Sequence, residues 1–465
     1  MQSGRDAVLR RGESKQHCSG KGGRGLALAT LCLAVLIAQL DSSVVNLAVA
    51  PIGRSLGASV AELQWTIDGY NLAYAVLLLT GGLLADLYGR RLVFMAGAVV
   101  FVAGSLGCAA APNVAVLVGG RVVAGVGAAL LLPASLALVA VVWPDPAKRR
   151  NALGIWSACN GLSFVIGPTL GGLLIAHAGW RSIFIVVVPL GMAAVGLALA
   201  VLPESSDPQG RAFDASAQIL GALILGGLAL AGIEAQDFPA LALGAAALAC
   251  ALFPLFWTIE RRRGDAALVP LDLFRIRTFR GAILATAGMT FGMYGMLFLL
   301  PMSWQRAGVL SAVGAGLALV PMAAIFALVS PFSGFLTHRL GARTMTSGGV
   351  ALIGCGLCVL AAVVGERTII SAIVGLSITG LGMGVATGPL FAVAVGAVAP
   401  ARSGTAAALI NVARMVGATI GVAMLGSVYA LFGGGPLGLR VALFLGGAVQ
   451  LCAAAMAWIE GRDHA

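Results

Sequence analysis

The sequence predicts an all-α polytopic membrane protein, on the basis of three observations. Hydrophobic residues make up 59% of the 465 residues and charged residues only 10%, and the mean hydropathy is +0.99. Apolar segments of about twenty residues, the length that crosses a bilayer, recur along the chain. The 65 glycines favour closely packed membrane helices. Because a soluble domain carries about 25% charged residues, a soluble enzyme, a disordered chain and a secreted disulfide-rich protein are excluded.

Fourteen membrane spans are predicted from the apolar segments. A helix rises about 1.5 Å per residue, so about twenty residues cross a hydrocarbon core of about 30 Å. An even number of spans places both termini on the same side of the membrane. The predicted spans cover residues 26–50, 63–85, 92–111, 114–142, 151–176, 182–202, 215–235, 239–259, 279–303, 309–336, 344–364, 368–397, 404–432 and 438–459.

An internal repeat divides the chain into two halves. The stretch that begins at Gly82 reads GLLADLYGR, and a similar stretch, GFLTHRLGA, begins at Gly334, 252 residues later. Three further glycines recur at an offset of 250 residues. They are Gly154, Gly167 and Gly171, which recur as Gly404, Gly417 and Gly421. Because an even number of spans separates the copies, the two halves share one orientation.

Six spans in each half leave two spans over, so we expect two six-helix bundles and two extra central helices. Parallel halves of this kind enclose a central site near the middle of the membrane. The expected boundaries are a cytoplasmic tail at 1–25, an N-terminal six-helix bundle at 26–203, a two-helix central insert with a basic cytoplasmic connector at 204–278, a C-terminal six-helix bundle at 279–460 and a cytoplasmic tail at 461–465.

The positive charges predict the orientation. With the N-terminus inside, 22 of the 29 Lys and Arg residues lie on the inner side, 5 on the outer side, and the other two, Arg121 and Arg414, within helices. This asymmetry follows the positive-inside rule. We therefore expect a monomeric, multi-pass protein of the plasma membrane, here a bacterial inner membrane, with both termini cytoplasmic. The basic residues form no continuous stripe, so no nucleic-acid partner is expected.

Asp41 and Arg121 are the first candidates for chemistry. A carboxylate within hydrocarbon is costly and usually functional, and proton binding and release would suit it. Asp41 lies about 22 Å from the inner end of its span, and Arg121 about 10 Å from the outer end of its own. In a core of about 30 Å these depths nearly coincide, so an Asp41–Arg121 interaction is possible. A purely structural ion pair is the alternative.

Asp68 is the second acidic candidate, in the sequence WTIDGY just inside the outer end of the second span. It could add a proton site or attract cationic substrates. At such a shallow depth it could equally face water.

Asp86 ends the second span at the inner side, where the helix dipole disfavours a carboxylate. Arg90 and Arg91 lie close in sequence. The span that begins at Gly404, in the other half, also has its N-terminus on the inner side. A contact of Asp86 with that N-terminus would latch the two halves together, with Gly89 at the turn. A solvated turn residue is the alternative.

Several polar and soft side chains are candidates for the lining of a substrate cavity. Methionine and tyrosine suit an adaptable apolar pocket, although a lipid-facing or packing stripe would look the same in sequence. Arg414 lies at mid-depth without an obvious acidic partner. The candidates are Asn46, Met289, Met293, Tyr294, Asn411 and Arg414.

Gly167 and Pro168, in GLSFVIGPTLGG, allow close helix approach and a local bend. The sequence contains no phosphate-binding loop, paired catalytic carboxylates, nucleophile elbow or metal-ligand cluster. We therefore expect no enzyme activity, no metal and no cofactor. The only CxxC, at Cys355 and Cys358, lies in an apolar run and is interpreted as packing.

These motifs resemble the fourteen-helix drug/proton antiporter branch of the major facilitator superfamily, over nearly the whole chain. LDSSVVNLA from residue 40 is similar to the first-helix motif of that branch, and GGLLADLYGRR at 81–91 to motif A. RVVAGVG at 121–127 is similar to motif B, and GLSFVIGPTLGG at 161–172 to antiporter motif C. NVARMVGATIGVAMLG at 411–426 resembles the late-helix pattern. Ala124 replaces the usual Gln of motif B.

The resemblance implies export of hydrophobic or cationic drugs or antibiotics in exchange for protons, by alternating access. It assigns proton coupling to Asp41 and Arg121, the latch to Asp86, and exchange to Gly167 and Pro168. Import of a specific small metabolite, by symport or uniport, is the alternative, and a sensor or channel without coupled transport is a third class. The antiport scheme requires that Asp41 reach a central water-filled space.

Overall fold

The computed structural model describes residues 21–206, 214–264, 267–365, 369–399 and 402–461, and within these ranges every regular element is a helix. The elements of the first half are α2 (Lys21–Leu56), α3 (Val60–Tyr88), α4 (Arg90–Ala109), α5 (Val114–Val142), α6 (Pro146–Ala178), α7 (Ser182–Ile185) and α8 (Val187–Val201). Two central helices follow, α9 (Ala215–Ile233) and α10 (Pro239–Arg263), and then the 3₁₀ turn η2 (Leu271–Arg275). The second half has α11 (Arg277–Arg306), α12 (Ala312–Val329), the 3₁₀ turn η3 (Ser330–Phe332), α13 (Ser333–Leu340), α14 (Ala342–Ala362), α15 (Ile369–Gly396), α16 (Ser403–Leu431) and α17 (Pro436–Glu460).

The all-α polytopic fold is confirmed. Thirteen helical segments among the described residues are long and apolar enough to cross a membrane. The 33-residue α6 is long enough to be the fourteenth. Most of the predicted tail at 1–25 and of the tail at 461–465 lies outside the described residues, and α2 already begins at Lys21. The predicted domain boundaries stay predictions.

Two of the predicted spans are interrupted in the structure. The span at 182–202 consists of α7 and α8, with Val186 between them. Pro189 explains the break, because it has no N–H to donate to the Ile185 carbonyl, where α7 ends. The span at 309–336 passes through the 3₁₀ turn η3 between α12 and α13, and η3 contains Pro331. Apolar composition predicts the span but not these irregular turns.

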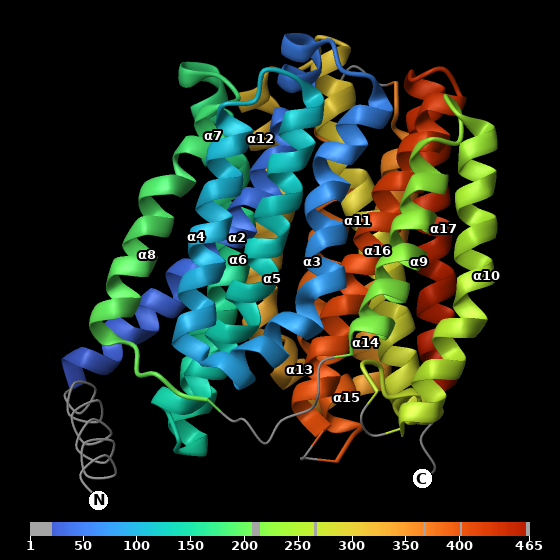
Figure 1. Ribbon diagram of the computed structural model, residues 1–465. Coiled ribbons are helices and arrows are strands. Elements are labelled where there is room, and N and C mark those ends of the chain that lie inside the picture. The colour runs from blue at the N-terminus through green and yellow to red at the C-terminus, as the bar shows by residue number, and fades with distance from the viewer. Residues whose placement is uncertain (1–20, 207–213, 265–266, 366–368, 400–401, 462–465) are drawn as a thin grey trace, which may run out of the picture.

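The helices form two bundles that stand side by side (Figure 1). In the first, α5 packs against α3 and α4, and α2 against α6. In the second, α11 packs against α16 and α17, and α14 against α15 and α17. The bundles meet through α3 with α16, α6 with α12 and α2 with α11. We call the end where α2 begins and α17 ends the lower end, and the opposite end the upper end, as in Figure 1.

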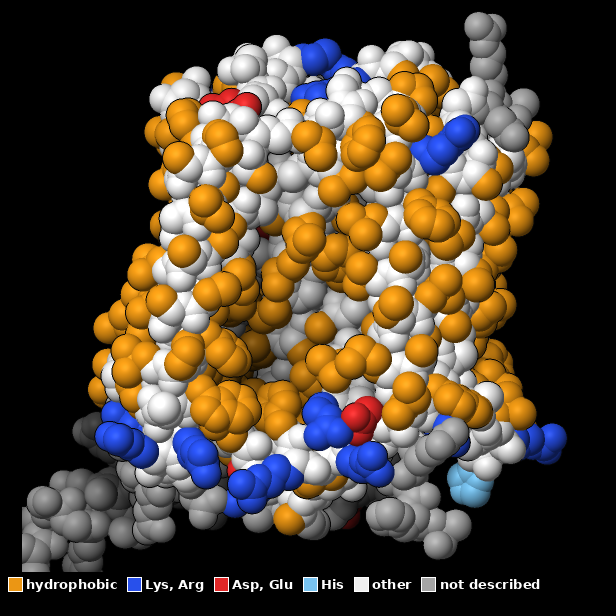
Figure 2. All heavy atoms as spheres, turned by 90° about the vertical axis from the view of Figure 1, so that its right-hand side faces the viewer, with side chains coloured by type: hydrophobic (Ala, Val, Ile, Leu, Met, Phe, Trp, Pro, Cys, Tyr) orange, Lys and Arg blue, Asp and Glu red, His pale blue; other side chains and the backbone are white. Residues whose placement is uncertain are grey.

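The two central helices lie beside the junction of the bundles. α9 packs against α3 of the first half and α16 of the second, and α10 packs on α9. Figure 2 shows the face on the right-hand side of Figure 1, where α10 lies. Hydrophobic side chains cover its middle and line a groove, and Lys and Arg side chains gather along its lower rim. The apolar belt matches a hydrocarbon core, and the basic rim matches a membrane–water interface.

Candidate functional site

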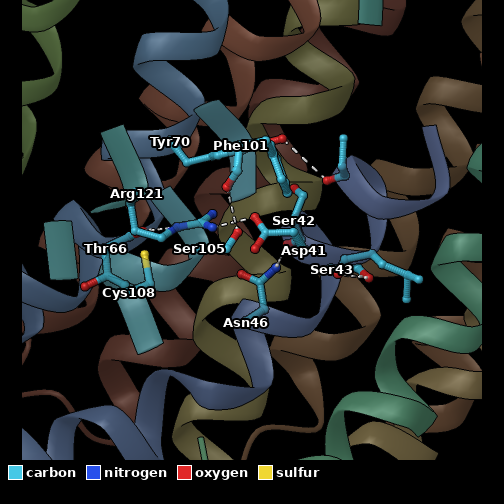
Figure 3. A network of polar contacts seen from close by, with 12 residues as sticks. Asp41, Ser42, Ser43, Asn46, Thr66, Tyr70, Phe101, Ser105, Cys108 and Arg121 are labelled. Atoms are coloured by element: carbon cyan, nitrogen blue, oxygen red, sulfur yellow. Dashed lines mark hydrogen bonds and ion pairs between the residues drawn. The ribbon is translucent and has the colours of Figure 1, made fainter. Parts of the chain in front are cut away.

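Asp41 and Arg121 form a buried ion pair, as their depths predict. Asp41 lies in α2 and Arg121 in α5, and Arg121 Nη1 donates to Asp41 Oδ2 (Figure 3). The side chains are only 1% and 2% exposed, respectively. The guanidinium Nε also donates to the Thr66 carbonyl of α3 at 3.0 Å. The pair therefore ties α2, α3 and α5 together inside the first bundle.

The surroundings of the pair leave one carboxylate oxygen free. The Arg121 guanidinium carbon lies 4.5 Å from the centroid of the Tyr70 ring, a cation–π arrangement. Among the described residues, Asp41 Oδ1 has no hydrogen-bond partner. A buried polar atom without a partner is costly, so Asp41 remains a candidate functional residue. The Asp41 side chain is 1% exposed, so in this conformation it does not meet the requirement that it reach a central water-filled space.

Small residues allow the helices to approach closely enough for this pair. A Cβ atom on Gly125, in α5, would meet the backbone of Tyr70 in α3. A Cβ on Gly104, in α4, would meet the backbone of Ala124 in α5. The alanine that replaces the motif B glutamine is therefore part of the α4–α5 contact. This packing brings Arg121 within reach of α2 and α3.

The residues of the first-helix motif pack against the Gly-Pro motif. Ser43 of α2 donates to the Leu40 carbonyl at 3.1 Å and to the Ser163 carbonyl of α6 at 3.4 Å. A Cβ on Gly167 would collide with the Ser43 hydroxyl. Asn46 is 3% exposed and donates to the Ser42 carbonyl at 3.0 Å. Asn46 thus lies beside the ion pair, within the first bundle (Figure 3).

Pro168 lies where α6 meets the second half. A Cβ on Gly316 of α12 would collide with the Pro168 carbonyl oxygen, and one on Gly172 would lie 2.9 Å from the Cα of Val313. The backbones of α6 and α12 are therefore in direct contact at this level. Motif C thus forms part of the junction between the halves, and its gating role stays a prediction.

Asp68 lies in α3 and is fully buried. The interpretation that Asp68 faces water is therefore wrong. Within the described part of the chain, neither carboxylate oxygen accepts a hydrogen bond. The sequence predicts how deep Asp68 lies along its helix. It does not predict the rotation of α3 about its axis, which turns Asp68 into the bundle. Its proposed part in proton coupling stays a prediction.

Asp86 pairs with Arg90 at the lower end of α3, with Oδ1 and Nη2 2.7 Å apart. Gly89 separates α3 from α4 with φ of +116°, a backbone conformation that favours glycine. Glu204, which is not among the sequence-based candidates, accepts from the backbone N–H of Arg91 at 3.0 Å and so caps α4. The predicted contact of Asp86 with α16 stays a prediction for another conformation.

The cavity candidates of the second half differ in burial, and their part in a substrate cavity stays a prediction. Met289, Met293 and Tyr294 of α11 are 3–4% exposed. Asn411 and Arg414 of α16 are partly exposed. The Arg414 guanidinium lies next to the Tyr74 hydroxyl of α3, across the junction between the halves. Tyr74 therefore supplies a neutral partner for a cation whose counter-charge the sequence does not reveal.

Several buried glutamines, absent from the sequence-based candidates, donate side-chain hydrogen bonds to helix backbones, and three of them lie at or near the contacts of α11 and α16. Gln64 Nε2 of α3 donates to the carbonyls of Val422 and Ala423 in α16, at 2.9 and 2.8 Å. Gln305 Nε2 of α11 donates to the Leu47 carbonyl of α2 at 3.0 Å. The hydrogen bonds of Gln64 and of Gln305 therefore cross between the two halves near the upper end. Gln450 of α17 instead donates to α11, within the second half.

The comparisons with known proteins agree with this architecture. The model of the Major Facilitator Superfamily matches residues 31–422. The chain belongs to this superfamily. A bacterial homologue of the human lysosomal transporter Spinster, solved in an inward-facing, unoccupied conformation, has a TM-score of 0.68 at 18% identity and covers 96% of this chain and 98% of that one. A peptide transporter of the POT type has a TM-score of 0.70 at 15% identity and 93% coverage of both chains. The chain is thus a membrane transporter of small molecules, not an enzyme.

Curated relatives cover most of the chain. The multidrug resistance protein Stp of Mycobacterium tuberculosis is 37% identical over 87% of this chain and 76% of its own length. A methylenomycin A resistance protein of Bacillus subtilis is 32% identical over 93% of both chains. A probable actinorhodin transporter of Streptomyces coelicolor is 32% identical over 87% of this chain and 72% of its own length.

Proposed function

We propose that this transporter exports hydrophobic antibiotic-like compounds in exchange for protons, by alternating access. The buried Asp41–Arg121 pair carries the proposal, because it keeps a carboxylate with one unpartnered oxygen inside a membrane transporter. The names of the curated relatives, which refer to multidrug and methylenomycin A resistance, support export. The basic lower rim supports a cytoplasmic lower end in a bacterial inner membrane.

In the proposed cycle, the conformation described here opens toward the cytoplasm. Substrate enters from the lower end and the halves then rock, which brings Asp41 into contact with outer water. A proton on Oδ1 weakens the ion pair with Arg121, and substrate leaves to the outside. During the reverse movement, before the site closes, Asp41 releases the proton toward the cytoplasm and regains its ion pair with Arg121. One proton driven by 100 mV supplies about 2.3 kcal/mol, and one pH unit about 1.4 kcal/mol.

The test replaces Asp41 by Asn in inverted membrane vesicles. A compound panel in a pump-deficient bacterium first identifies an exported compound. With the vesicle lumen one pH unit more acidic than the buffer, wild-type protein should accumulate that compound about tenfold for each proton exchanged. Asp41→Asn should bring this ratio close to one, yet retain exchange of labelled for unlabelled compound. Accumulation at the wild-type level would remove Asp41 from the mechanism.

The matched control is Glu460→Gln, which removes a carboxylate paired with Arg280 at the lower end. This variant should keep the wild-type accumulation ratio. The same vesicles distinguish export from import. Proton symport in the import direction would empty preloaded vesicles when the lumen is acidified, instead of filling them.

A further inference from the structure

Arg414 lies in the interior of the transporter, near the middle of the membrane. It is about 17 Å along α16 from the lower end of that helix, at about 1.5 Å per residue. α16 is surrounded by α3, α9, α11, α15 and α17. The side chain is nevertheless partly exposed. Because helices surround α16 and the guanidinium lies next to Tyr74 of the other half, the exposed part of Arg414 faces the space between the halves.

The charge of Arg414 is not compensated by the protein. Within the described ranges, no carboxylate oxygen lies within 4.0 Å of its guanidinium, and its Nε has no hydrogen-bond partner. The two acidic groups nearest to mid-depth do not offer an exposed negative charge. Asp41 is neutralised by Arg121, and Asp68 is fully buried in α3. An unpaired cation in hydrocarbon is costly, so it marks a binding position.

Soft and aromatic side chains lie on the helices around this cation. Tyr294 of α11 lies close enough to Tyr74 for their hydroxyl groups to interact electrostatically. Met293 precedes Tyr294, and α11 packs along α16. Such side chains suit a flat apolar ligand, and a guanidinium offers forked donors to a carboxylate or phenolate oxygen.

We propose that Arg414 anchors an anionic oxygen, a carboxylate or a phenolate, of an otherwise aromatic substrate. This inference rests on the proposed transport function and names the chemical class of its substrate. It differs from the expectation of cationic substrates, because the partly exposed charge near mid-depth is positive, whereas Asp41 is paired with Arg121 and Asp68 is fully buried.

A matched pair of probes tests the proposal in binding, without a proton gradient. The probes are 2-naphthoate and (naphthalen-2-yl)methylammonium, which share a ring system and differ in charge. Equilibrium binding to the full-length protein in lipid nanodiscs should favour the carboxylate by at least tenfold. Arg414→Gln should abolish this preference, and Arg414→Lys should retain part of it, since the charge remains but the fork is lost.

Arg181→Gln separates anchoring by Arg414 from the general loss of an arginine. Arg181 donates to the Ala111 carbonyl at 2.9 Å within the first half, so this variant should keep the carboxylate preference. Tighter binding of the ammonium probe by wild-type protein, binding of neither probe, or an unchanged preference in Arg414→Gln would overturn the proposal. If Arg414→Gln does not fold, the wild-type preference and Arg414→Lys decide. Failure of the Asp41→Asn test would leave this binding result intact.

Discussion

The upper and lower ends of the molecule are held together by different interactions. At the upper end, three buried contacts join the two halves. Gln64 donates to α16, Gln305 donates to α2, and Gly316 packs against the Pro168 carbonyl. At the lower end, the ion pairs of Asp86 with Arg90 and of Glu460 with Arg280 each stay within one half. A Cβ on Gly404, at the lower end of α16, would meet no atom within 4 Å. Opening the upper end therefore breaks specific contacts, whereas separating the lower ends breaks neither of these two ion pairs.

Distances between spin labels can measure this difference. One pair reports on the upper end, Ser55→Cys with Leu437→Cys, and another on the lower end, Leu92→Cys with Leu340→Cys. All four positions are exposed, and in each pair the two residues belong to different halves. The background is a chain in which the eight native cysteines are replaced.

The largest shift is expected from Gly316→Val. Its Cβ would collide with the Pro168 carbonyl oxygen, which belongs to backbone and cannot move without shifting α6. Overpacking of this kind costs about 1–3 kcal/mol. The population of molecules with a long distance between the upper labels should therefore rise at least about fivefold. In the same molecules the distance between the lower labels should be shorter.

Gly334→Val is the control for this variant. It adds the same side chain to α13 at a position where a Cβ has no neighbour within 4 Å. If both valine variants give the same distance distributions, close approach at Gly316 does not hold the upper end together.

A smaller shift is expected when the crossing glutamines lose their donors. In Gln64→Met and, as a separate variant, in Gln305→Met, size is nearly kept, but the hydrogen bonds to Val422 and Ala423 or to Leu47 are lost. A net hydrogen bond contributes about 1 kcal/mol, and the carbonyls remain within their helices. Each substitution should thus raise the upper-open population about fivefold, as seen in the upper label pair.

Gln450→Met is the matched control for the glutamines. Gln450 is fully buried and donates to the Met289 carbonyl at 2.7 Å, within the second half. Its loss should reduce thermal stability and leave both label distances unchanged. An opening of the upper end by Gln450→Met equal to that of Gln64→Met would show that general destabilisation, and not the crossing contact, is responsible.

The sequence predicted those features that depend on depth in the membrane. Apolar length and the fixed helical rise placed Asp41 and Arg121 at one level, and the structure pairs them. The contacts of Gln64 and Gln305 were not predictable in this way. Their partners are backbone carbonyls, which leave no trace in side-chain chemistry, and the contacts depend on which helix faces meet. The burial of Asp68 depends likewise on helix rotation, which a nearly uniform apolar sequence does not reveal.

The smallest effect in this conformation is expected from Asp86→Asn. The Asp86–Arg90 pair is an exposed pair within one turn, with side chains 41% and 21% exposed, and such pairs contribute about 0.3–0.5 kcal/mol. If Asp86 contacts the N-terminus of α16 when the lower end closes, its charge favours that state by about 0.3–1 kcal/mol. Asp86→Asn should then reduce the lower-closed population about two- to fivefold. The control is Arg90→Gln, which breaks the same pair but keeps the Asp86 carboxylate. If Asp86 acts as a latch, Arg90→Gln should leave the lower label distance unchanged or favour the lower-closed state. An equal loss of the lower-closed population in both variants would assign the effect to the Asp86–Arg90 pair alone.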